Sequence, residues 1–300
     1  MGELTLGDPA GRIPTPIPAR DEAPYRVTGI ERRTPTIVEV WMRPLAGRLP
    51  YLPGEFVLLE DADRMVPPRS YSIANPQRSD GLISVLVTRV AGGQTSGWVH
   101  DRLRPGDEVT VTGPYGTFVA DPAAAAPCLH LAAGSGLAPI RALIESALEA
   151  SPPRSLTLVF SAGTKADVLD RDRFLSWQGI HPHFRYIRTL TRGPGAEPRG
   201  RIPDVLPSLC PHLADHEVFI AGAPGFVRAC ALAAEALGAV PARMHTEPFF
   251  VELPVRTGPV SSPAGGAVRT MAARPAPTHA RGISLEPGSR SPSRQRLHDR

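Results

Sequence analysis

The sequence predicts two domains in series, a small antiparallel β-barrel followed by a doubly wound α/β domain with a parallel sheet. Three observations predict this arrangement. The 300 residues, 42% of them hydrophobic, are enough for two domains that each bury their own core. Short alternating patterns fill the first half of the chain, as in small barrels. After residue 121 the pattern changes to apolar runs separated by segments of helical spacing, which is typical of a parallel sheet covered by helices.

The barrel is expected from short strands divided by Pro and Gly. A further strand is expected where Arg, an aromatic residue and hydroxyl residues alternate from Arg69 to Ser72. The other segments are residues 25–33, 36–44, 54–60, 82–90 and 107–116. These segments place the barrel domain at residues 24–120, and a linker is expected at 121–127.

The second domain is expected at residues 128–253. Five apolar runs predict its strands, and they lie at residues 128–133, 156–162, 184–190, 217–223 and 243–247. The clearest helix spans residues 139–150. Its apolar residues recur three and four positions apart and include Ile140, Leu143, Ile144, Ala147 and Leu148. Alternating strands and helices predict the doubly wound sheet.

Both ends of the chain have the composition of unfolded segments. Residues 1–23 contain several Pro and Gly without apolar periodicity, so a flexible leader is expected. Residues 254–300 are dominated by Pro, Ser, Gly and Arg, and such a segment buries too little apolar surface to offset its ordering entropy. A disordered tail is therefore expected, and both an inert extension and an interaction tail remain open for it.

The positive charge of the chain belongs to this tail. Residues 255–300 contain eight Arg and two acidic residues, a net charge of +6, whereas the whole chain carries +4. The remaining residues are therefore slightly acidic. Without a basic stripe to neutralise phosphates, nucleic acid is excluded as the main ligand.

Cysteine usage bears on metal sites and on location. Cys128, Cys210 and Cys230 are far apart, so no pair has the spacing of a zinc site or of a plant-type iron–sulfur cluster, and no metal site is expected. A sparse, odd number of cysteines suits a reducing cytosol. The sequence shows no signal peptide and no apolar run long enough to span a bilayer. We therefore expect a cytoplasmic protein without a membrane span.

The strand Arg69–Ser72 is the first candidate binding motif. With a period of two, Arg69 and Tyr71 share one face of the strand. A guanidinium beside an aromatic ring suits a flavin nucleotide, because it offers a bidentate partner for the pyrophosphate and a stacking surface for the ring system. Spacing alone is equally compatible with an exposed Arg–Tyr pair on a barrel strand.

Two glycine-rich turns are further candidates. Residues 92–96 precede a short helix-like run, which favours an anion site at a helix N-terminus, although an ordinary glycine turn capped by Ser96 has the same pattern. Residues 132–139 form a strand-to-helix turn of the kind that binds pyrophosphate. This turn lacks the third glycine of the full dinucleotide-binding motif, because Pro139 takes its place.

The order of the motifs identifies a family. The arrangement RSYS, GGQTS, GPYGTF, AAGSGLAP, FIAGAPGFV and HTEPFF between Tyr25 and Phe250 resembles the ferredoxin–NADP reductase family, in particular the flavin-reductase modules of bacterial oxygenase electron-transfer chains. The resemblance implies that the barrel binds FAD and that the second domain binds NADH or NADPH. It also implies an oxidoreductase that passes electrons from NAD(P)H through FAD to a separate ferredoxin-like or Rieske-type iron–sulfur protein.

The resemblance also implies roles for individual residues. In the barrel motif, which includes Ser70, Arg69 would pair with the FAD pyrophosphate, Tyr71 would stack on the isoalloxazine, and Ser72 would lie near flavin N5. Glu247 matches the family's acidic residue beside the flavin, although a solvated carboxylate remains open for it. Ser72 and Glu247 are thus the catalytic candidates. The residues that would close over the FAD pyrophosphate are Gly93, Gln94, Thr95 and Ser96.

In the second domain the resemblance implies a coenzyme site on two turns. The turn that would bind the coenzyme pyrophosphate contains Gly134, Ser135 and Gly136. The turn beneath the nicotinamide ribose contains Gly222, Ala223 and Pro224. The choice between NADH and NADPH stays open, because Thr191, Arg192 and Lys165 either meet a 2′-phosphate or are merely solvated.

Two departures from the family pattern qualify these expectations. Ala221 stands where the family usually has Cys, so hydride transfer is expected to be slower. The chain also lacks the fused 2Fe–2S ferredoxin domain of many oxygenase reductases. Two alternative functions remain: a flavin reductase or diaphorase that acts on small acceptors, and a flavin-binding electron-transfer or regulatory subunit without catalytic activity, for which the missing Cys is the only support.

Overall fold

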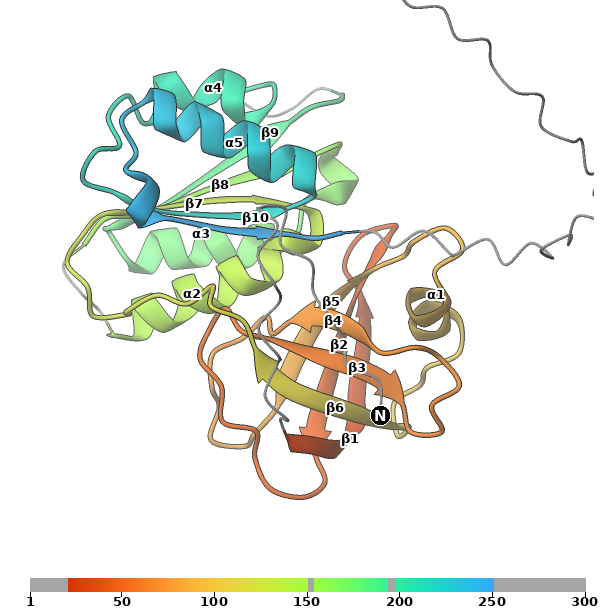
Figure 1. Ribbon diagram of the computed structural model, residues 1–300. Coiled ribbons are helices and arrows are strands. Elements are labelled where there is room, and N and C mark those ends of the chain that lie inside the picture. The colour runs from red at the N-terminus through yellow and green to blue at the C-terminus, as the bar shows by residue number, and fades with distance from the viewer. Residues whose placement is uncertain (1–20, 151–153, 194–197, 251–300) are drawn as a thin grey trace, which may run out of the picture. The chain divides into compact units, whose positions relative to one another are not determined.

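A computed structural model describes residues 21–150, 154–193 and 198–250 of the chain. These residues form an antiparallel barrel followed by a parallel sheet with helices (Figure 1), so the predicted two-domain fold is confirmed. Most of the expected leader and the whole expected tail, residues 254–300, lie outside the described residues.

The barrel consists of six antiparallel strands in the order β4-β3-β6-β1-β2-β5. A backbone bridge between Ile73 and Val85 joins the two ends of this order, so the barrel is nearly closed. The strands are β1 (Asp21–Arg32), β2 (Ile37–Pro44), β3 (Phe56–Asp61), β4 (Arg69–Ser72), β5 (Ile83–Thr88) and β6 (Glu108–Tyr115). The pairing of β1 starts at Asp21, three residues before the expected boundary, because backbone pairing with β6 does not require apolar side chains.

Strand β5 is buried on both of its faces. Ile83, Val85 and Val87 point into the barrel core, which explains the alternating pattern. Leu86, on the opposite face, belongs to the same buried cluster as Leu143 of the second domain. The barrel and the second domain therefore share a packed interface, and β5 lies at it.

The second domain has a parallel sheet in the order β11-β10-β7-β8-β9. Its strands are β7 (Cys128–Ala133), β8 (Leu156–Ala162), β9 (Phe184–Leu190), β10 (Glu217–Gly222) and β11 (Met244–Pro248). The α-helices are α2 (Leu137–Ala150), α3 (Arg171–Ile180), α4 (Ile202–Leu209) and α5 (Pro224–Ala236). All five strands lie within a residue of the predicted runs.

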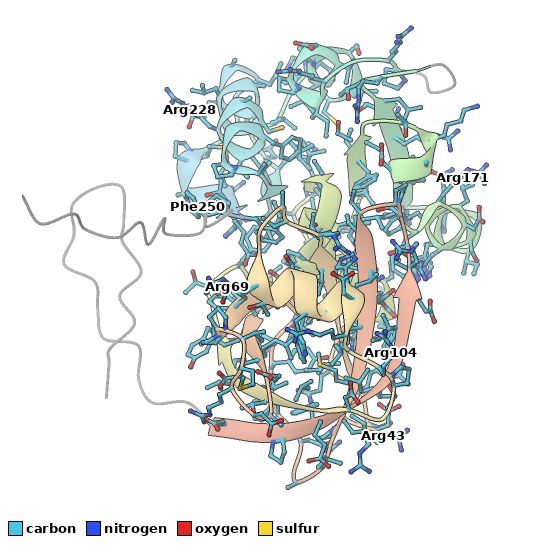
Figure 2. The ribbon with its side chains drawn as sticks, turned by 90° about the vertical axis from the view of Figure 1, so that its right-hand side faces the viewer. Arg43, Arg69, Arg104, Arg171, Arg228 and Phe250 are labelled. Atoms are coloured by element: carbon cyan, nitrogen blue, oxygen red, sulfur yellow. The ribbon has the colours of Figure 1, made fainter. Side chains whose placement is uncertain are left out.

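Helices cover both faces of this sheet. Side chains of α2 and α3 belong to one buried cluster, whereas those of α4 and α5 belong to another. In Figure 2, Arg171 of α3 and Arg228 of α5 accordingly lie on opposite sides of the domain. The doubly wound arrangement leaves the carboxyl ends of the strands open, and that edge carries the glycine turns. No helix in the described part of the chain is long and apolar enough to cross a membrane.

Candidate functional site

The barrel contributes strand β4 to the site. Arg69 and Tyr71 are both half-buried, whereas Ser70 is exposed and Ser72 is buried. The Tyr71 ring packs against the barrel core. Burial raises the pKa of Tyr71 to about 12, although the charge of Arg69 acts in the opposite direction, so the phenol stays neutral at physiological pH. Figure 2 shows Arg69 on the barrel, near the short helix.

That short helix, α1 (Gln94–Asp101), begins close to the start of β4. The hydroxyl of Thr95 donates a hydrogen bond to the carbonyl of Pro67, two residues before Arg69. Ser96 does not cap the helix, because its hydroxyl oxygen accepts a hydrogen bond from the Val90 N–H at 3.2 Å instead. Among the described residues, no side chain caps α1 at its N-cap Gly93, so the first N–H groups of the helix can bind a ligand or solvent.

Gly93 leaves no room for a side chain at this point. A Cβ atom there would lie 2.6 Å from the Ser96 hydroxyl oxygen, closer than real contacts allow. The side chain of Gln94 is exposed beside it. The predicted anion site thus has its backbone in place next to Arg69, which is the arrangement that a pyrophosphate needs.

The sheet domain contributes two turns that touch each other. The turn Gly134–Gly136 links β7 to α2, and a Cβ atom on Gly136 would lie 2.2 Å from the carbonyl oxygen of Ala221. Only glycine permits this close approach. Ala223 and Pro224 are exposed at the N-terminus of α5, just after Gly222. The residues predicted to bind the coenzyme from separate parts of the chain are therefore brought together.

The turn also contacts the barrel. The hydroxyl of Thr88, at the end of β5, donates a hydrogen bond to the hydroxyl oxygen of Ser135 at 2.9 Å. Ala221, which stands where the family usually has Cys, is fully buried in the cluster beneath α2. The candidate site therefore lies where the two domains meet.

The two catalytic candidates are in direct contact across this boundary. The Ser72 hydroxyl donates a hydrogen bond to Glu247 Oε1 at 3.2 Å, joining β4 of the barrel to β11 of the sheet. The second carboxyl oxygen of Glu247 is buried and has no hydrogen-bond partner among the described residues. Burial raises the pKa of Glu247 to about 7, although the Ser72 hydrogen bond lowers it. The interpretation of Glu247 as a solvated carboxylate does not fit this burial.

A cavity of about 430 Å³ opens beside the coenzyme turn. Its walls come from the barrel, including Thr36 and Thr88, and from the carboxyl ends of the parallel strands, including Gly134. Thr191 and Arg192 line it, but Lys165 does not and is exposed. Crevices at this edge of doubly wound sheets bind nucleotides. Of the three residues considered for a 2′-phosphate, Thr191 and Arg192 thus lie in the lining of this cavity and Lys165 lies outside it.

A charged cluster at the same boundary was not predicted from the sequence. Arg141 of α2 is fully buried and bonds to Glu39 of the barrel and to Asp170 of the sheet domain. A signal was present, because Arg141 follows Ile140 on an apolar helix and Glu39 lies between two valines of a barrel strand. Charged residues in such positions are rarely buried without partners.

The described residues fit a flavin nucleotide and a nicotinamide dinucleotide. The barrel offers an arginine, a neutral aromatic ring and an uncapped helix N-terminus, and an unpartnered oxygen of Glu247 lies next to Ser72. The sheet domain offers a turn that only glycine can form and an adjoining cavity. The barrel residues and the sheet-domain residues adjoin, so a flavin bound to the first and a nicotinamide bound to the second would lie close together.

Comparisons with known proteins agree with this arrangement. Residues 38–119 match the oxidoreductase FAD-binding domain family, and residues 131–231 match the oxidoreductase NAD-binding domain family. The reductase subunit of an aromatic O-demethylase from Amycolatopsis sp. is 31% identical over 80% of this chain and 72% of its own length. The ferredoxin–NAD(P)+ reductase component of the naphthalene 1,2-dioxygenase and salicylate 5-hydroxylase systems from Ralstonia sp. is 29% identical over 75% of this chain and 68% of its own.

Solved structures show the same fold. The Amycolatopsis cytochrome P450 reductase superposes with a TM-score of 0.71 at 29% identity, covering 80% of this chain and 72% of that one. The ferredoxin reductase of carbazole 1,9a-dioxygenase has a TM-score of 0.70 at 24% identity, covering 79% of this chain and 71% of that one.

A further sequence relative is longer than this chain. The terephthalate 1,2-dioxygenase reductase component 2 from Comamonas sp. is 29% identical, and this chain spans 61% of its length.

Proposed function

The chain belongs to the family of oxidoreductases that combine an FAD-binding with an NAD-binding domain, and on this premise we propose that it is the reductase component of an electron-transfer system. In this proposal it takes a hydride from NADH or NADPH onto FAD and delivers the electrons to a separate iron–sulfur protein. The name of the Ralstonia relative, a ferredoxin–NAD(P)+ reductase component, supports this type of acceptor. We also propose a cytoplasmic location, in keeping with three cysteines that are all free thiols.

The contact between Ser72 and Glu247 carries the proposal. It joins the strand proposed to bind the flavin to the last strand of the domain proposed to bind the coenzyme. Hydride transfer needs the two reacting groups within about 3–3.5 Å of each other, and positioning supplies much of the rate. This partly buried polar contact at the junction of the two sites is where such an encounter would take place.

Each part of the site has a distinct task in this reaction. Bound FAD supplies the ability to accept two electrons together and to release them singly. Arg69 and the first turn of α1 would hold its pyrophosphate, and Tyr71 offers a flat neutral surface. The turn Gly134–Gly136 would hold the coenzyme pyrophosphate at the start of α2.

Ser72 and Glu247 would manage a proton. A carboxyl with a pKa of about 7 exchanges its proton readily at neutral pH, which suits general acid–base work. The hydrogen bond from Ser72 to Oε1 keeps the carboxyl oriented, and Oε2 remains available to hold the proton. The pair is partly buried at the domain boundary, which limits its contact with bulk water.

Anaerobic mixing of the FAD-loaded protein with each coenzyme tests the proposal. We expect the flavin absorbance to bleach rapidly with NADH or NADPH and to recover when an oxidised ferredoxin-type protein is added. A protein that stays yellow with both coenzymes would be a non-catalytic flavin-binding subunit. Recovery with free flavin or a quinone, but not with iron–sulfur proteins, would make it a diaphorase. Steady-state kcat/KM values for NADH and NADPH then identify the preferred coenzyme.

A further inference from the structure

The buried side chain of Arg141 connects the two domains through four hydrogen bonds. Its Nε–H donates to the carbonyl of Ala74 at 2.6 Å, two residues beyond Ser72. One terminal nitrogen donates to Asp170 Oδ2 at 2.7 Å. The other donates to Glu39 Oε1 and to the Ser84 hydroxyl oxygen, which lies 3.1 Å away. Three of these acceptors belong to the barrel, so the guanidinium of a sheet-domain helix is embedded in the other domain.

The charges around Arg141 are balanced. Asp170 and Glu39 each lie between Arg141 and Arg33, because Arg33 also contacts both carboxylates. Burial alone would raise the pKa of Asp170, but the neighbouring arginines outweigh it and hold that pKa below its usual value. Two positive and two negative groups therefore alternate, which is the condition under which buried charges are tolerated.

At Asp170 the network replaces the usual helix cap of α3. The residue occupies the N-cap position of α3, where an aspartate side chain ordinarily bonds to the helix backbone. No such bond forms, since both carboxyl oxygens bond to Arg33 and Arg141. Its backbone also has a φ of 50°, a left-handed conformation that few non-glycine residues adopt and that aspartate tolerates better than most. The helix α3 thus lacks a side-chain cap because Asp170 bonds to the two arginines instead.

The network lies next to both candidate binding motifs. Arg141 is five residues after Gly136 on a continuous helix, so its position fixes the turn at the start of α2. The Ala74 carbonyl, which accepts a hydrogen bond from Arg141, lies on the segment that follows β4. Arg141 therefore links the Gly134–Gly136 turn to β4. Any rotation of one domain against the other would break several of these hydrogen bonds at once.

We propose that Arg141 is a positioning residue, whose guanidinium, held between Glu39 and Asp170, fixes the coenzyme-binding turn Gly134–Gly136 against the flavin-binding strand β4. This inference rests on the proposed function. Stability alone does not account for such a cluster, because well-packed apolar residues of similar volume often stabilise a core equally well or better. What the planar guanidinium supplies and an apolar side chain lacks is a fixed orientation towards several acceptors.

The substitution Arg141→Lys tests this inference while keeping the charge. An ammonium group cannot reach all four acceptors in one plane, so the charge remains but the orientation is lost. We expect normal FAD content and a coenzyme dissociation constant within about threefold of the wild type. The rate of flavin bleaching at saturating coenzyme should fall at least tenfold, because a displacement of about 1 Å costs about 100-fold in such reactions.

Two further measurements separate positioning from general stability. Amide hydrogen exchange should increase around the Gly134–Gly136 turn and β4 in R141K, but not in α5. The matched control is Arg171→Lys on α3, an exposed arginine outside the network, which should change neither exchange nor rate. A role in stability alone would lower the melting temperature of R141K and leave the saturated rate unchanged.

The outcomes distinguish this inference from the proposed function. If the flavin of the wild type and that of R141K are reduced at the same rate by saturating coenzyme, the positioning role is wrong and the proposed function stands. If the wild type binds FAD but neither coenzyme reduces it, the positioning role and the proposed function are both wrong. If R141K does not fold, Ser84→Ala removes a single hydrogen bond and keeps every charge. It should slow bleaching two- to fivefold at unchanged FAD content, and an unchanged rate would overturn the inference.

Discussion

The substitution Glu247→Gln is expected to stabilise the flavin-free protein increasingly as the pH rises. Glu247 is largely buried, bonds to Ser72 through one oxygen and has no hydrogen-bond partner for the other among the described residues. Burial raises its pKa from an ordinary value of 4.5 to about 7. Ionisation of Glu247 therefore favours the unfolded state, in which water solvates the carboxylate. Glutamine keeps the size and the hydrogen-bond acceptor but removes the charge.

The size and the pH range of the effect follow from these two values. Below about pH 4.5 the carboxyl is protonated in both states and the substitution has little effect. The folded protein binds the proton more tightly, so its free energy of unfolding falls as the pH rises towards 7 and is fully reduced above that. Each pH unit corresponds to about 1.4 kcal/mol, so the total reaches at most about 3.5 kcal/mol. Partial exposure of Glu247 makes this an upper limit.

Urea denaturation of the flavin-free protein between about pH 4.5 and 8.5 measures this difference. The free energy of unfolding of E247Q should exceed that of the wild type by about 2–3 kcal/mol above pH 7.5, and the two should converge at the acidic end. The matched control is Glu235→Gln on α5, an exposed glutamate, which should show no such pH dependence. A constant difference between E247Q and the wild type at all pH values would refute the argument that burial raises the pKa of Glu247.

Three further substitutions test individual parts of the site. Arg69→Ala should weaken FAD binding by about 1.5–3 kcal/mol, because a charge-assisted contact is lost, while hydride transfer in FAD-saturated protein changes little. Equilibrium dialysis measures FAD binding and anaerobic mixing measures hydride transfer, and equal losses in both would assign Arg69 another role. Gly136→Ala should weaken coenzyme binding at least tenfold at normal FAD content, because its methyl group meets the Ala221 carbonyl, and unchanged titration by NAD+ and NADP+ would contradict the close approach. Arg192→Ala should lower kcat/KM for NADPH more than for NADH if the cavity takes a 2′-phosphate, and a loss equal for both coenzymes would exclude that contact.

Local patterns were sufficient to predict most of the fold. The central strands β7, β8 and β10 follow from apolar runs, because strands buried on both faces cannot contain many polar residues. The helical spacing from Ile140 to Leu148 likewise predicts α2. The first residues of β1 were missed, since Asp21 and Glu22 join β6 through backbone pairing, for which no apolar pattern is needed. A side-chain pattern carries no information about such pairing.

The candidate site was predictable as a set of motifs but not as an assembly. The order of the motifs identified the family, and each motif has a local signature in turn residues or in alternation. Contacts such as that between Ser72 and Glu247 join residues far apart in the sequence, and one sequence gives no direct signal of them. Ser96 illustrates the limit, because the expected helix cap competes with a hydrogen bond to Val90 that only the folded loop reveals.

The Arg141 cluster was missed because its residues contradict the local patterns that surround them. An arginine beside Ile140 looks like an exposed residue at the border of an apolar helix face, and Glu39 looks like a solvent-facing residue of a barrel strand. Neither residue is exposed in the folded protein, because β2 and α2 both direct these side chains into the interface between the two domains. A charge that breaks an apolar pattern in one domain is thus explained by an opposite charge that breaks the pattern in the other. Such mismatched pairs indicate where two domains are held in a fixed orientation, which hydride transfer between their ligands requires.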